Sequence, residues 1–382
     1  MTGTTIESDE APDSGFGAIT GPRRDRLRQQ LANLRALTVG DGIRYEVRTE
    51  HVVLHSEPHR ELRRYGGLSS LLRAREIGRG PVLLIPPLAA PATCYDLGPA
   101  HSLVGHLLQT GRVPYVVDYG EIGRADRNMG FEDFIDDIVP QAIDRVLADF
   151  GGPAGTEVDV IAWSLGGTVS LLSLAAHPEL PVRSITAVGT PLNYALVPPY
   201  PVVRTMTAPT KGRAITAVLK LLGGIPAPMV QLAYRATAWE RELKKPWFIL
   251  NNLGETETLA RMEVVNRFQR TFPGYPGRLV EQMWERLIYR DELARGVVTL
   301  GNRSIDLTSI AVPIQLFGSH RDAIVPWRAA QHGVELFGSS PQVHFTTVET
   351  SHLGLIAGPD AVRETWPRID GFLDALPAPT VS

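Results

Sequence analysis

The chain has 382 residues, of which 43% are hydrophobic and 21% charged, and its formal net charge at pH 7 is −3. This composition allows a large core, and the charge gives no reason to expect a nucleic-acid partner. Its one cysteine, Cys94, excludes an internal disulfide and a cysteine-based metal site, and we interpret it as a small buried hydrophobic residue. We expect a cytoplasmic protein without a metal or cofactor.

The first part of the chain predicts a leader, a helix and short strands. Residues 1–21 are polar and acidic, lack the basic and apolar runs of a signal peptide, and predict a disordered leader. Residues 22–75 are expected to join the core. Within them, leucines at helical spacing predict an amphipathic helix over 22–37, and alternating residues over 45–65 predict one or two antiparallel strands.

From residue 76 onwards, apolar strands alternate with helices. Strands are expected at PVLLIPP, VPYVVDYG, VDVIAWS and VRSITAVGTP, and again later at PIQLFGS and VHFTTVETSH. Strands that are apolar throughout predict an α/β fold, with a mostly parallel sheet covered by helices on both faces. We expect this core at 76–195 and 306–375, followed by a tail at 376–382.

More than 100 residues interrupt this alternation. Residues 196–305 are rich in proline at first and helical in pattern later, which predicts a helical cap inserted into the core. The longest apolar stretch of this region contains Lys220, paired glycines and two prolines, so it is a poor membrane span.

One serine, Ser164, stands between a predicted strand and a predicted helix in the sequence AWSLGG. This context is typical of a nucleophile elbow, whose strained turn requires small residues two positions away on each side, here Ala162 and Gly166. Serine is also a favoured residue at the start of a helix, so the motif alone leaves both interpretations open.

Two later residues stand where the partners of such a serine are expected. In this fold the acid follows a late strand and the histidine follows the last strand. Asp322 follows PIQLFGS and His352 follows VHFTTVE, so His352 is the predicted general base for Ser164 and Asp322 the residue that orients it. Asp322 could instead be a turn residue, and His320 could be the functional ring, although it would reverse the expected order. His344 lies inside a strand and is interpreted as structural.

An oxyanion hole needs two backbone N–H donors. Leu165 is expected to supply one, because it follows the nucleophile. Leu88 or Ala89 is expected to supply the other from the loop after PVLLIPP, since Pro86 and Pro87 have no N–H. The remaining histidines show no metal-ligand spacing with carboxylates.

With these residues in place, the chain resembles the polyhydroxyalkanoate synthase branch of the α/β-hydrolases over roughly residues 78–372. The likeness includes PVLLIPPLAAPATCYDLGPAHSLVGHLL, VVDYGEIGRADRNMGFEDFI, the elbow with LAAHPE behind it, NRSIDLTSIAVPIQLFGSHRDAIVPW and SHLGLIAGP. The resemblance implies Asp322 as the acid of a triad, His352 as its base, and an acyl-CoA or acyl-ester substrate. The synthases have cysteine at the elbow, where this chain has Ser164.

Serine in this place favours hydrolysis. A thioester readily passes its acyl group to another alcohol, whereas water is a sufficient acceptor for the oxygen ester that a serine forms. We therefore expect a serine esterase or lipase-like hydrolase acting on a hydrophobic acyl ester or thioester. The alternatives are an acyltransferase, including a synthase-like enzyme with an acyl-CoA donor, and a non-catalytic binding module, which would predict a broken triad.

The cap is expected to be a mobile lid that sets acyl selectivity, with Leu221, Leu222 and Met229 beside the acyl chain. The expected partners are a small-molecule acyl substrate, a lipid or polyester-granule surface contacted from outside, and a second copy of the chain.

Overall fold

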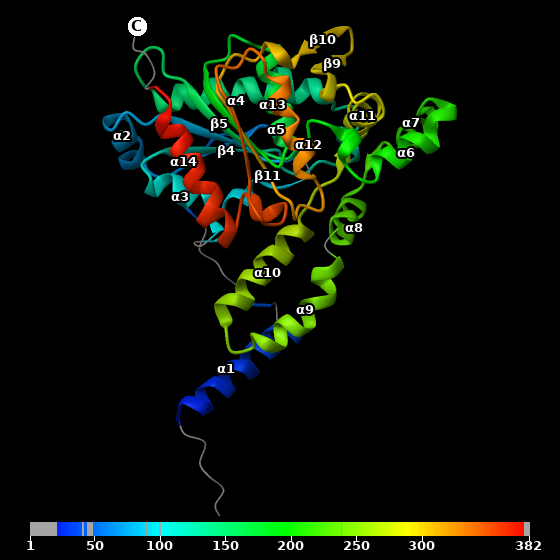
Figure 1. The fold of residues 1–382 in the computed structure, drawn as a ribbon. Coiled ribbons are helices and arrows are strands. Elements are labelled where there is room, and N and C mark those ends of the chain that lie inside the picture. Colours follow the sequence, from blue (N-terminus) through cyan, green and yellow to red (C-terminus); the bar gives the residue numbers. More distant parts are fainter. Residues whose placement is uncertain are drawn as a thin grey trace, which may run out of the picture. The chain divides into compact units, whose positions relative to one another are not determined.

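A computed structural model describes residues 21–39, 42–43, 49–88, 90–98, 101–237 and 239–377 (Figure 1). The chain divides into a smaller unit, Met1–Arg44 with Lys244–Glu263, and a larger unit, Tyr45–Leu243 with Val264–Ser382. The predicted leader, apart from Gly21, and residues 378–382 of the predicted tail lie outside the described residues.

The larger unit is built on an eight-stranded sheet in the order β1-β2-β4-β3-β5-β6-β11-β12. Its strands are β1 (His51–His55), β2 (Glu61–Tyr65), β3 (Pro81–Ile85), β4 (Val113–Asp118), β5 (Val158–Trp163), β6 (Val182–Val188), β11 (Ile314–Gly318) and β12 (Val343–Thr347). β2 pairs antiparallel with β1 and β4, and all other neighbours are parallel. The predicted mostly parallel sheet and the antiparallel strands over 45–65 are confirmed.

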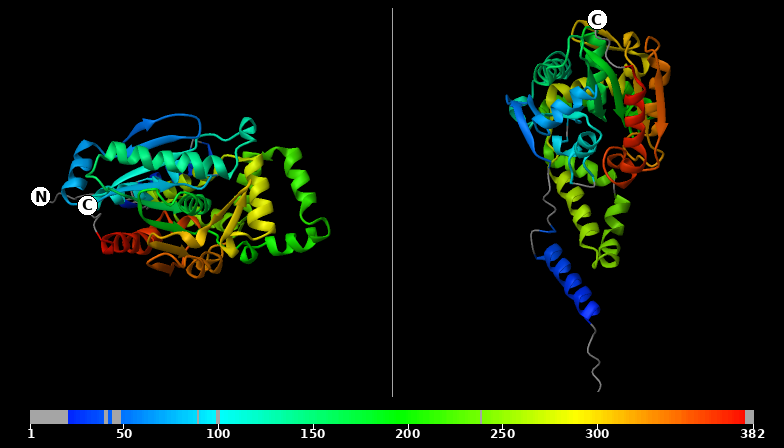
Figure 2. Two further views of the ribbon diagram at one scale, coloured as in Figure 1. Left: turned by 90° about the horizontal axis from the view of Figure 1, so that it is seen from above. Right: turned by 90° about the vertical axis from the view of Figure 1, so that its left-hand side faces the viewer.

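Helices cover both faces of this sheet because its central strands are apolar at nearly every position. In β3, Leu83 and Ile85 join one cluster of buried side chains, whereas Val82 and Leu84 join the other. The first cluster includes α4 (Val139–Phe150) and α5 (Leu165–Ala176), and the second includes α3 (Leu103–Gln109) and α14 (Trp366–Ala375). Figures 1 and 2 show α4 in teal and α14 in red on opposite sides of the sheet.

Two helical stretches of the core are irregular. The sequence FEDFIDDIVPQAIDRVLADF begins as a π-helical segment, Asp133–Ile138, and continues as α4. Between β11 and β12 lie two short helices, α12 (Trp327–Gln331) and α13 (Gly333–Leu336). The sequence pattern did not anticipate α2 (Leu68–Glu76), which lies between β2 and β3.

The region predicted as a cap contains the helices between β6 and β11. They are α6 (Tyr200–Thr207), α7 (Arg213–Leu222), α8 (Ala227–Thr237), α9 (Trp239–Asn251), α10 (Thr256–Arg270) and α11 (Gly277–Gln282). Two antiparallel pairs were not anticipated: β7 (Gly224–Ile225) with β8 (Tyr275–Pro276), and β9 (Val297–Leu300) with β10 (Arg303–Asp306). No described helix is long and apolar enough to cross a membrane.

The smaller unit contains α1 (Gly21–Thr38), the helix predicted over 22–37, and the turn between α9 and α10. The amide of Asn33, which is buried, donates to the carbonyl of Leu253 at 2.8 Å, and the amide of Gln29 donates to Thr256 Oγ1 at 2.7 Å. The predicted leucine stripe stays open to solvent, with Leu31 66% exposed. Side-chain amide hydrogen bonds, rather than packing of the leucines, therefore join α1 to the segment between α9 and α10 in this unit.

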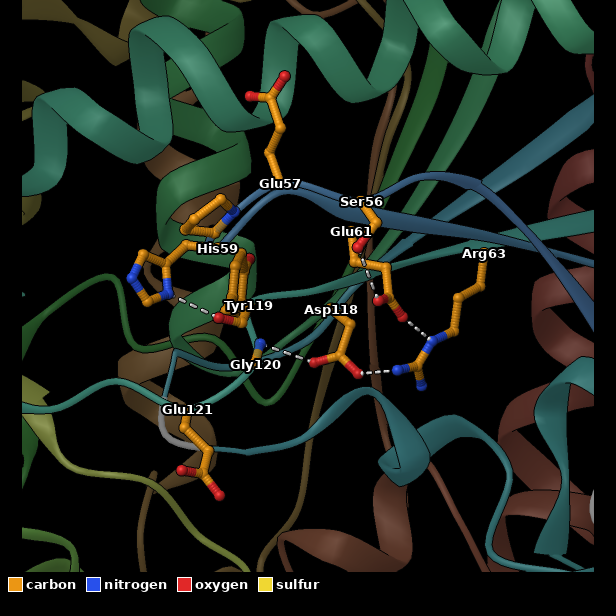
Figure 3. Close-up of a pocket in the computed structure, with 10 residues that line it drawn as sticks. Ser56, Glu57, His59, Glu61, Arg63, Asp118, Tyr119, Gly120 and Glu121 are labelled. Atoms are coloured by element: carbon orange, nitrogen blue, oxygen red, sulfur yellow. Dashed lines mark hydrogen bonds and ion pairs between the residues drawn. The ribbon is translucent and has the colours of Figure 1, made fainter.

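A pocket of about 380 Å³ opens between the β1–β2 turn and the end of β4 (Figure 3). Its charged groups face one another: the guanidinium of Arg63 lies 2.6 Å from Asp118 and also contacts Glu61, and His59 Nδ1 lies 2.8 Å from the Tyr119 carbonyl oxygen. None of the predicted site residues lines this pocket, so we look for the candidate site elsewhere.

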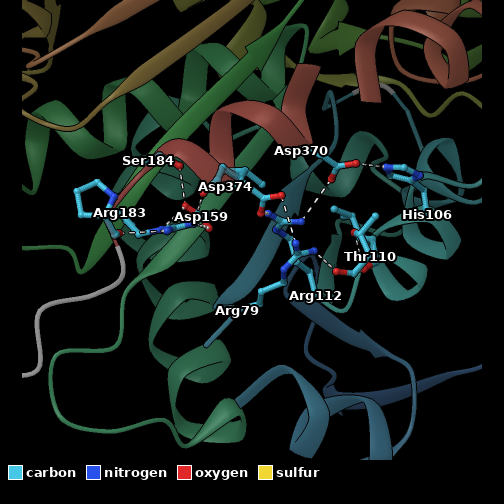
Figure 4. A network of polar contacts seen from close by, with 12 residues as sticks. Arg79, His106, Thr110, Arg112, Asp159, Arg183, Ser184, Asp370 and Asp374 are labelled. Atoms are coloured by element: carbon cyan, nitrogen blue, oxygen red, sulfur yellow. Dashed lines mark hydrogen bonds and ion pairs between the residues drawn. The ribbon is translucent and has the colours of Figure 1, made fainter. Parts of the chain in front are cut away.

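Within the larger unit, an ionic network joins α14 to α3 and to the start of β4 (Figure 4). Arg112, just before β4, has only 2% of its side chain exposed and contacts both Asp370 and Asp374. His106 Nε2 lies 2.6 Å from Asp370. A buried guanidinium needs such partners, because an unpaired charge in the interior is strongly unfavourable. The network thus holds α14 against the edge from which β4 begins.

Candidate functional site

Ser164 occupies the sharp turn between β5 and α5. Its backbone has φ 53° and ψ −125°, a conformation that residues with a side chain rarely adopt. Three neighbours hold this turn: the Ser164 N–H donates to the Val188 carbonyl at 2.8 Å, and the Ser164 carbonyl accepts from the Gly167 N–H at 2.9 Å and the Thr190 hydroxyl at 3.0 Å. Within the described chain its side chain makes no capping hydrogen bond to α5, which disfavours the interpretation as a simple helix cap.

The two glycines behind Ser164 permit a close approach to other backbone. A Cβ atom at Gly166 would lie 2.5 Å from the Ile85 carbonyl oxygen, and one at Gly167 would lie 2.0 Å from the hydroxyl oxygen of Thr190. A larger residue would therefore push α5 away from the end of β3 at position 166 and against the Thr190 side chain at position 167. The strand–turn–helix context predicted from AWSLGG is present in the structure.

Asp322 and His352 are brought together although 29 residues separate them in the sequence. Asp322 follows β11 and His352 follows β12, and these neighbouring parallel strands end at the same edge of the sheet. His352 Nδ1 lies 2.6 Å from Asp322 Oδ2, with 4% and 0% of the two side chains exposed. The carboxylate can only accept, so Nδ1 carries the proton of this hydrogen bond.

Asp322 is also a turn residue. Its Oδ1 accepts from the backbone N–H groups of Ile324 at 2.8 Å and Val325 at 2.9 Å. The two interpretations of Asp322 from sequence are therefore compatible, because one carboxylate oxygen holds its own loop and the other holds His352.

The ring of His352 lies beside the turn of Ser164. It stacks against Trp163 with ring centroids 5.3 Å apart, and its Cε1 lies 3.0 Å from where a Cβ atom of Gly189 would be. Its Nε2 is buried and has no hydrogen-bond partner in the described chain. Within the described chain this outer nitrogen therefore makes no hydrogen bond, to Ser164 Oγ or to any other group.

Two tyrosines hold the loop after β3, which should carry the second oxyanion donor. Tyr95 donates to the Ile85 carbonyl at 2.7 Å, and Tyr119 donates to the Pro86 carbonyl at 3.3 Å. Burial raises the pKa of both hydroxyls, so they remain donors. Nothing in the spacing of these tyrosines could have revealed this role.

The structure describes two of the three predicted oxyanion donors, Leu165 and Leu88. Leu165 is the first residue of α5, where backbone N–H groups have no acceptor within the helix. Leu88 is fully buried in the loop after β3. Ala89 lies outside the described residues.

The competing residues lie in other surroundings. The ring of His320 is 46% exposed and pairs with Glu349. His344 is exposed on β12. Cys94 is fully buried, and burial raises the pKa of its thiol. Among the described residues, no group of three or more His, Cys, Asp and Glu side chains is arranged to hold a metal ion.

Four tyrosines from separate segments gather in the larger unit: Tyr194, Tyr200, Tyr234 and Tyr275. The rings of Tyr194 and Tyr200 lie 5.8 Å apart, and Tyr234 is hydrogen-bonded to Tyr275. Burial raises the pKa of Tyr234 to about 12, and the nearby charge of Asp322 adds to this shift. The positions of the four tyrosines follow no spacing that the sequence could show.

The three residues expected beside the acyl chain are exposed to solvent. Leu221 is 85% exposed, Leu222 is 47% exposed and Met229 is 52% exposed. A helical pattern marks an apolar face but does not say what covers it, and here the face is open to solvent.

The comparisons with known proteins agree with this architecture. Residues 82–365 match the model of the alpha/beta hydrolase family. The chain is 26% identical over 340 residues to the poly(3-hydroxyalkanoate) polymerase subunit PhaC of Cupriavidus necator, covering 86% of this chain and 54% of the relative. It is 22% identical over 368 residues to the subunit of the same name from Allochromatium vinosum, covering 92% of this chain and 98% of the relative.

The chain thus spans about half the length of the Cupriavidus relative and nearly all of the Allochromatium one. Among solved structures it is similar to an esterase from Rhodococcus, with 18% identity and a TM-score of 0.47 over 87% of this chain and 100% of that one.

Proposed function

Since the chain belongs to the alpha/beta hydrolase family, we propose that it is an acyl-transfer enzyme in which Ser164 is the nucleophile and His352 the general base. Asp322 orients His352 and stabilises its protonated form. The observation that carries this proposal is the 2.6 Å contact between His352 Nδ1 and Asp322, together with a buried His352 Nε2 that has no hydrogen-bond partner within the described chain.

In the first half of the reaction, Ser164 Oγ attacks the carbonyl carbon of the acyl substrate while His352 Nε2 accepts the hydroxyl proton. The carbonyl electrons move to its oxygen, which accepts hydrogen bonds from the N–H of Leu165 and from the loop after β3, at Leu88 or Ala89. The bond to the leaving alcohol or thiol then breaks, the leaving group takes the proton from His352, and an ester on Ser164 remains. In the second half, water repeats these steps and releases the acid.

The acyl acceptor decides which reaction class this is. Water is our first choice, because it is a sufficient acceptor for the oxygen ester on Ser164 once His352 takes its proton. Transfer to an alcohol, with an acyl-CoA donor, is the alternative and is supported by the similarity to PhaC polymerases. A non-catalytic binding module would be expected to lack part of the triad, whereas Ser164, Asp322 and His352 are all present.

The tyrosine group is proposed as part of the wall of the acyl site, in place of Leu221, Leu222 and Met229. Buried rings offer apolar surface to an acyl chain, and their hydroxyls can orient the substrate by hydrogen bonds. The boundaries of the cap, 196–305, and its movement as a lid are part of the proposal.

The surface of α6 and α7 is proposed to contact a lipid or polyester-granule surface. Residues 180–239 contain no Asp or Glu, although the whole chain has a net charge of −3. On α7, Val218 and Leu221 are exposed, whereas Ile215 and Leu219 pack against the core. A basic surface with exposed apolar side chains is typical of proteins that bind an anionic interface. A second copy of the chain is the alternative occupant, and a cytoplasmic location completes the proposal.

The test is mass spectrometry of the intact protein after exposure to a panel of acyl-CoAs and p-nitrophenyl esters, with and without an acceptor alcohol. Hydrolysis predicts transient acylation of the protein and release of free acid in both conditions. Transfer predicts that the alcohol becomes acylated at the expense of free acid. Absence of both acylation and product with every donor would contradict the proposal.

A further inference from the structure

Ser319 links the two loops that carry Asp322 and His352. It follows the last residue of β11, and its side chain is fully buried. Its hydroxyl donates to the Thr350 carbonyl and accepts from the Thr350 N–H at 3.1 Å and the Arg321 N–H at 3.0 Å. One hydroxyl has one donor and two acceptor sites, so all its hydrogen-bonding capacity is used.

These hydrogen bonds act close to the predicted acid and base. Ser319 stands three residues before Asp322, and Thr350 stands two residues before His352. The acid loop is also closed on itself, since Ser319 and Pro326 form a bridge. The base loop has a second tie, in which the Thr350 hydroxyl donates to Asp360 at 2.8 Å. The distance between the two loops therefore depends on Ser319.

We propose that Ser319 is a positioning residue whose hydroxyl sets the spacing of the two loops and thereby the hydrogen bond between Asp322 and His352. The inference rests on the proposed function, because it assigns Ser319 a part in that site. Without the hydroxyl, the buried Thr350 carbonyl and the Arg321 N–H lose this partner, and the Thr350 N–H keeps the Val348 carbonyl at 3.0 Å as its acceptor, which gives the loops a reason to separate or to admit water. The carboxylate of Asp322 would then hold the imidazole of His352 less firmly.

The chain offers a matched control in Ser340. Its hydroxyl lies 2.8 Å from the Val312 carbonyl and 2.9 Å from the Gln342 carbonyl and can donate to either one, so it joins the segments that lead into β11 and β12. Ser340 therefore links the same two strands at their amino-terminal ends, whereas Ser319 links them at the carboxyl-terminal ends, where Asp322 and His352 lie. A purely structural role would make Ser319→Ala and Ser340→Ala alike.

The experiment compares kcat, KM and the pH profile of kcat/KM for the wild type, Ser319→Ala, Ser319→Cys and Ser340→Ala, each with its thermal unfolding midpoint. We expect Ser319→Ala to lower kcat at least tenfold with KM changed less than threefold, because a displacement of about 1 Å in a catalytic group can cost 10²-fold. The acid limb of the profile should move to lower pH, since a loosened carboxylate stabilises the imidazolium less. Ser319→Cys, which keeps a weak donor, should be intermediate, and Ser340→Ala should match the wild type.

A second readout does not depend on turnover. The proton between His352 Nδ1 and Asp322 should give a low-field proton NMR signal in the wild type and in Ser340→Ala, and the signal should be lost or broadened in Ser319→Ala. If Ser319→Ala fails to fold, Ser319→Cys decides by the same measurements. Three results together would overturn the inference. They are a kcat of Ser319→Ala within about twofold of the wild type, an acid limb within about 0.2 pH units of it, and an unchanged NMR signal.

The failure of this inference can be told apart from the failure of the proposed function. If Ser164→Ala keeps its turnover, the proposed function is wrong whatever Ser319 does, and the NMR signal still tests the role of Ser319. If Ser164→Ala is inactive and Ser319→Ala behaves like Ser340→Ala, only the positioning role is wrong.

Discussion

The core and the cap region treat their apolar residues in opposite ways. In the core, β3 is apolar and fully buried, and α5 is buried from Leu165 to Leu174. In the cap region, α7 buries one side and leaves Val218 55% and Leu221 85% exposed. The core therefore buries its own apolar side chains, whereas the outer side of the cap region leaves apolar surface that a binding partner could cover. The proposed catalytic residues lie in the buried core, and the proposed partner surface lies on the exposed side of the cap region.

The largest effect should follow from removing the proposed nucleophile, Ser164, which lies in the core. Ser164→Ala should abolish labelling by a fluorophosphonate and lower kcat by about 10⁴-fold or more, because no other group can form the acyl ester. Intact-protein mass spectrometry and steady-state kinetics measure the two effects. Labelling that survives the substitution would show that the nucleophile lies elsewhere.

The next effect concerns orientation rather than bond formation. Asp322→Asn should lower kcat about 10⁴-fold, because an amide in this place favours the wrong tautomer of His352. Folding should be nearly intact, since the amide oxygen can still accept from Ile324 and Val325. His320→Ala is the control and should keep its activity, because this ring is half exposed and pairs with Glu349. The opposite ranking of the two variants would mean that the acid and base are wrongly assigned.

The contrast between core and cap should also appear in stability. Arg112→Ala removes a guanidinium that is 2% exposed and contacts Asp370 and Asp374. We expect it to lower the free energy of unfolding by roughly 2–3 kcal/mol, below the value for a fully buried pair because Asp374 can be rehydrated. Arg290→Ala, which removes a half-exposed partner of Glu285, should cost less than about 1 kcal/mol. Urea unfolding measures both, and equal losses would contradict the distinction.

A smaller effect should locate the acyl chain. Each added methylene buried by the enzyme contributes about 0.8 kcal/mol, so two should raise kcat/KM about tenfold until the site is full. Tyr234→Trp should move the longest well-used chain to a shorter one, and the exposed Leu221→Trp should not. The measurement is kcat/KM for p-nitrophenyl esters of rising length. A shift with Leu221→Trp alone would restore the placement expected from sequence.

The smallest effect should come from the charge of the outer cap surface. The double variant Lys211→Glu with Arg213→Glu should weaken binding to phosphatidylglycerol-containing vesicles about tenfold or more, since each basic residue near an anionic surface contributes about 1 kcal/mol. Arg73→Glu, an exposed change on α2, is the control. Vesicle cosedimentation at low and high salt measures the binding. Vesicle binding that is equal in all three proteins would remove the lipid proposal, and a dimer that dissociates in the double variant would replace it.

The sequence could predict what depends on local patterns. Apolar runs identified the strands, and small residues around Ser164 identified its turn. Asp322 and His352 could be named because the order of the strands fixes where an acid and a base must follow. Arg112, Ser319 and Tyr234 could not, because their partners come from distant segments and such contacts leave no periodic signal. The stripes on α1 and α7 were visible in the sequence, but their exposure depends on neighbours that periodicity does not describe.

The burial of Cys94 has a practical consequence. It is the only cysteine of the chain, it is fully buried, and burial raises the pKa of its thiol. Under mild conditions it should remain silent towards maleimides and methanethiosulfonates, which react with thiolates. A cysteine introduced at an exposed position of α7, such as Ala217, would then be the single site for a spin label or a fluorophore. The mobility of the spin label, or the quenching of the fluorophore, would then report in real time whether the cap region moves when an acyl substrate binds.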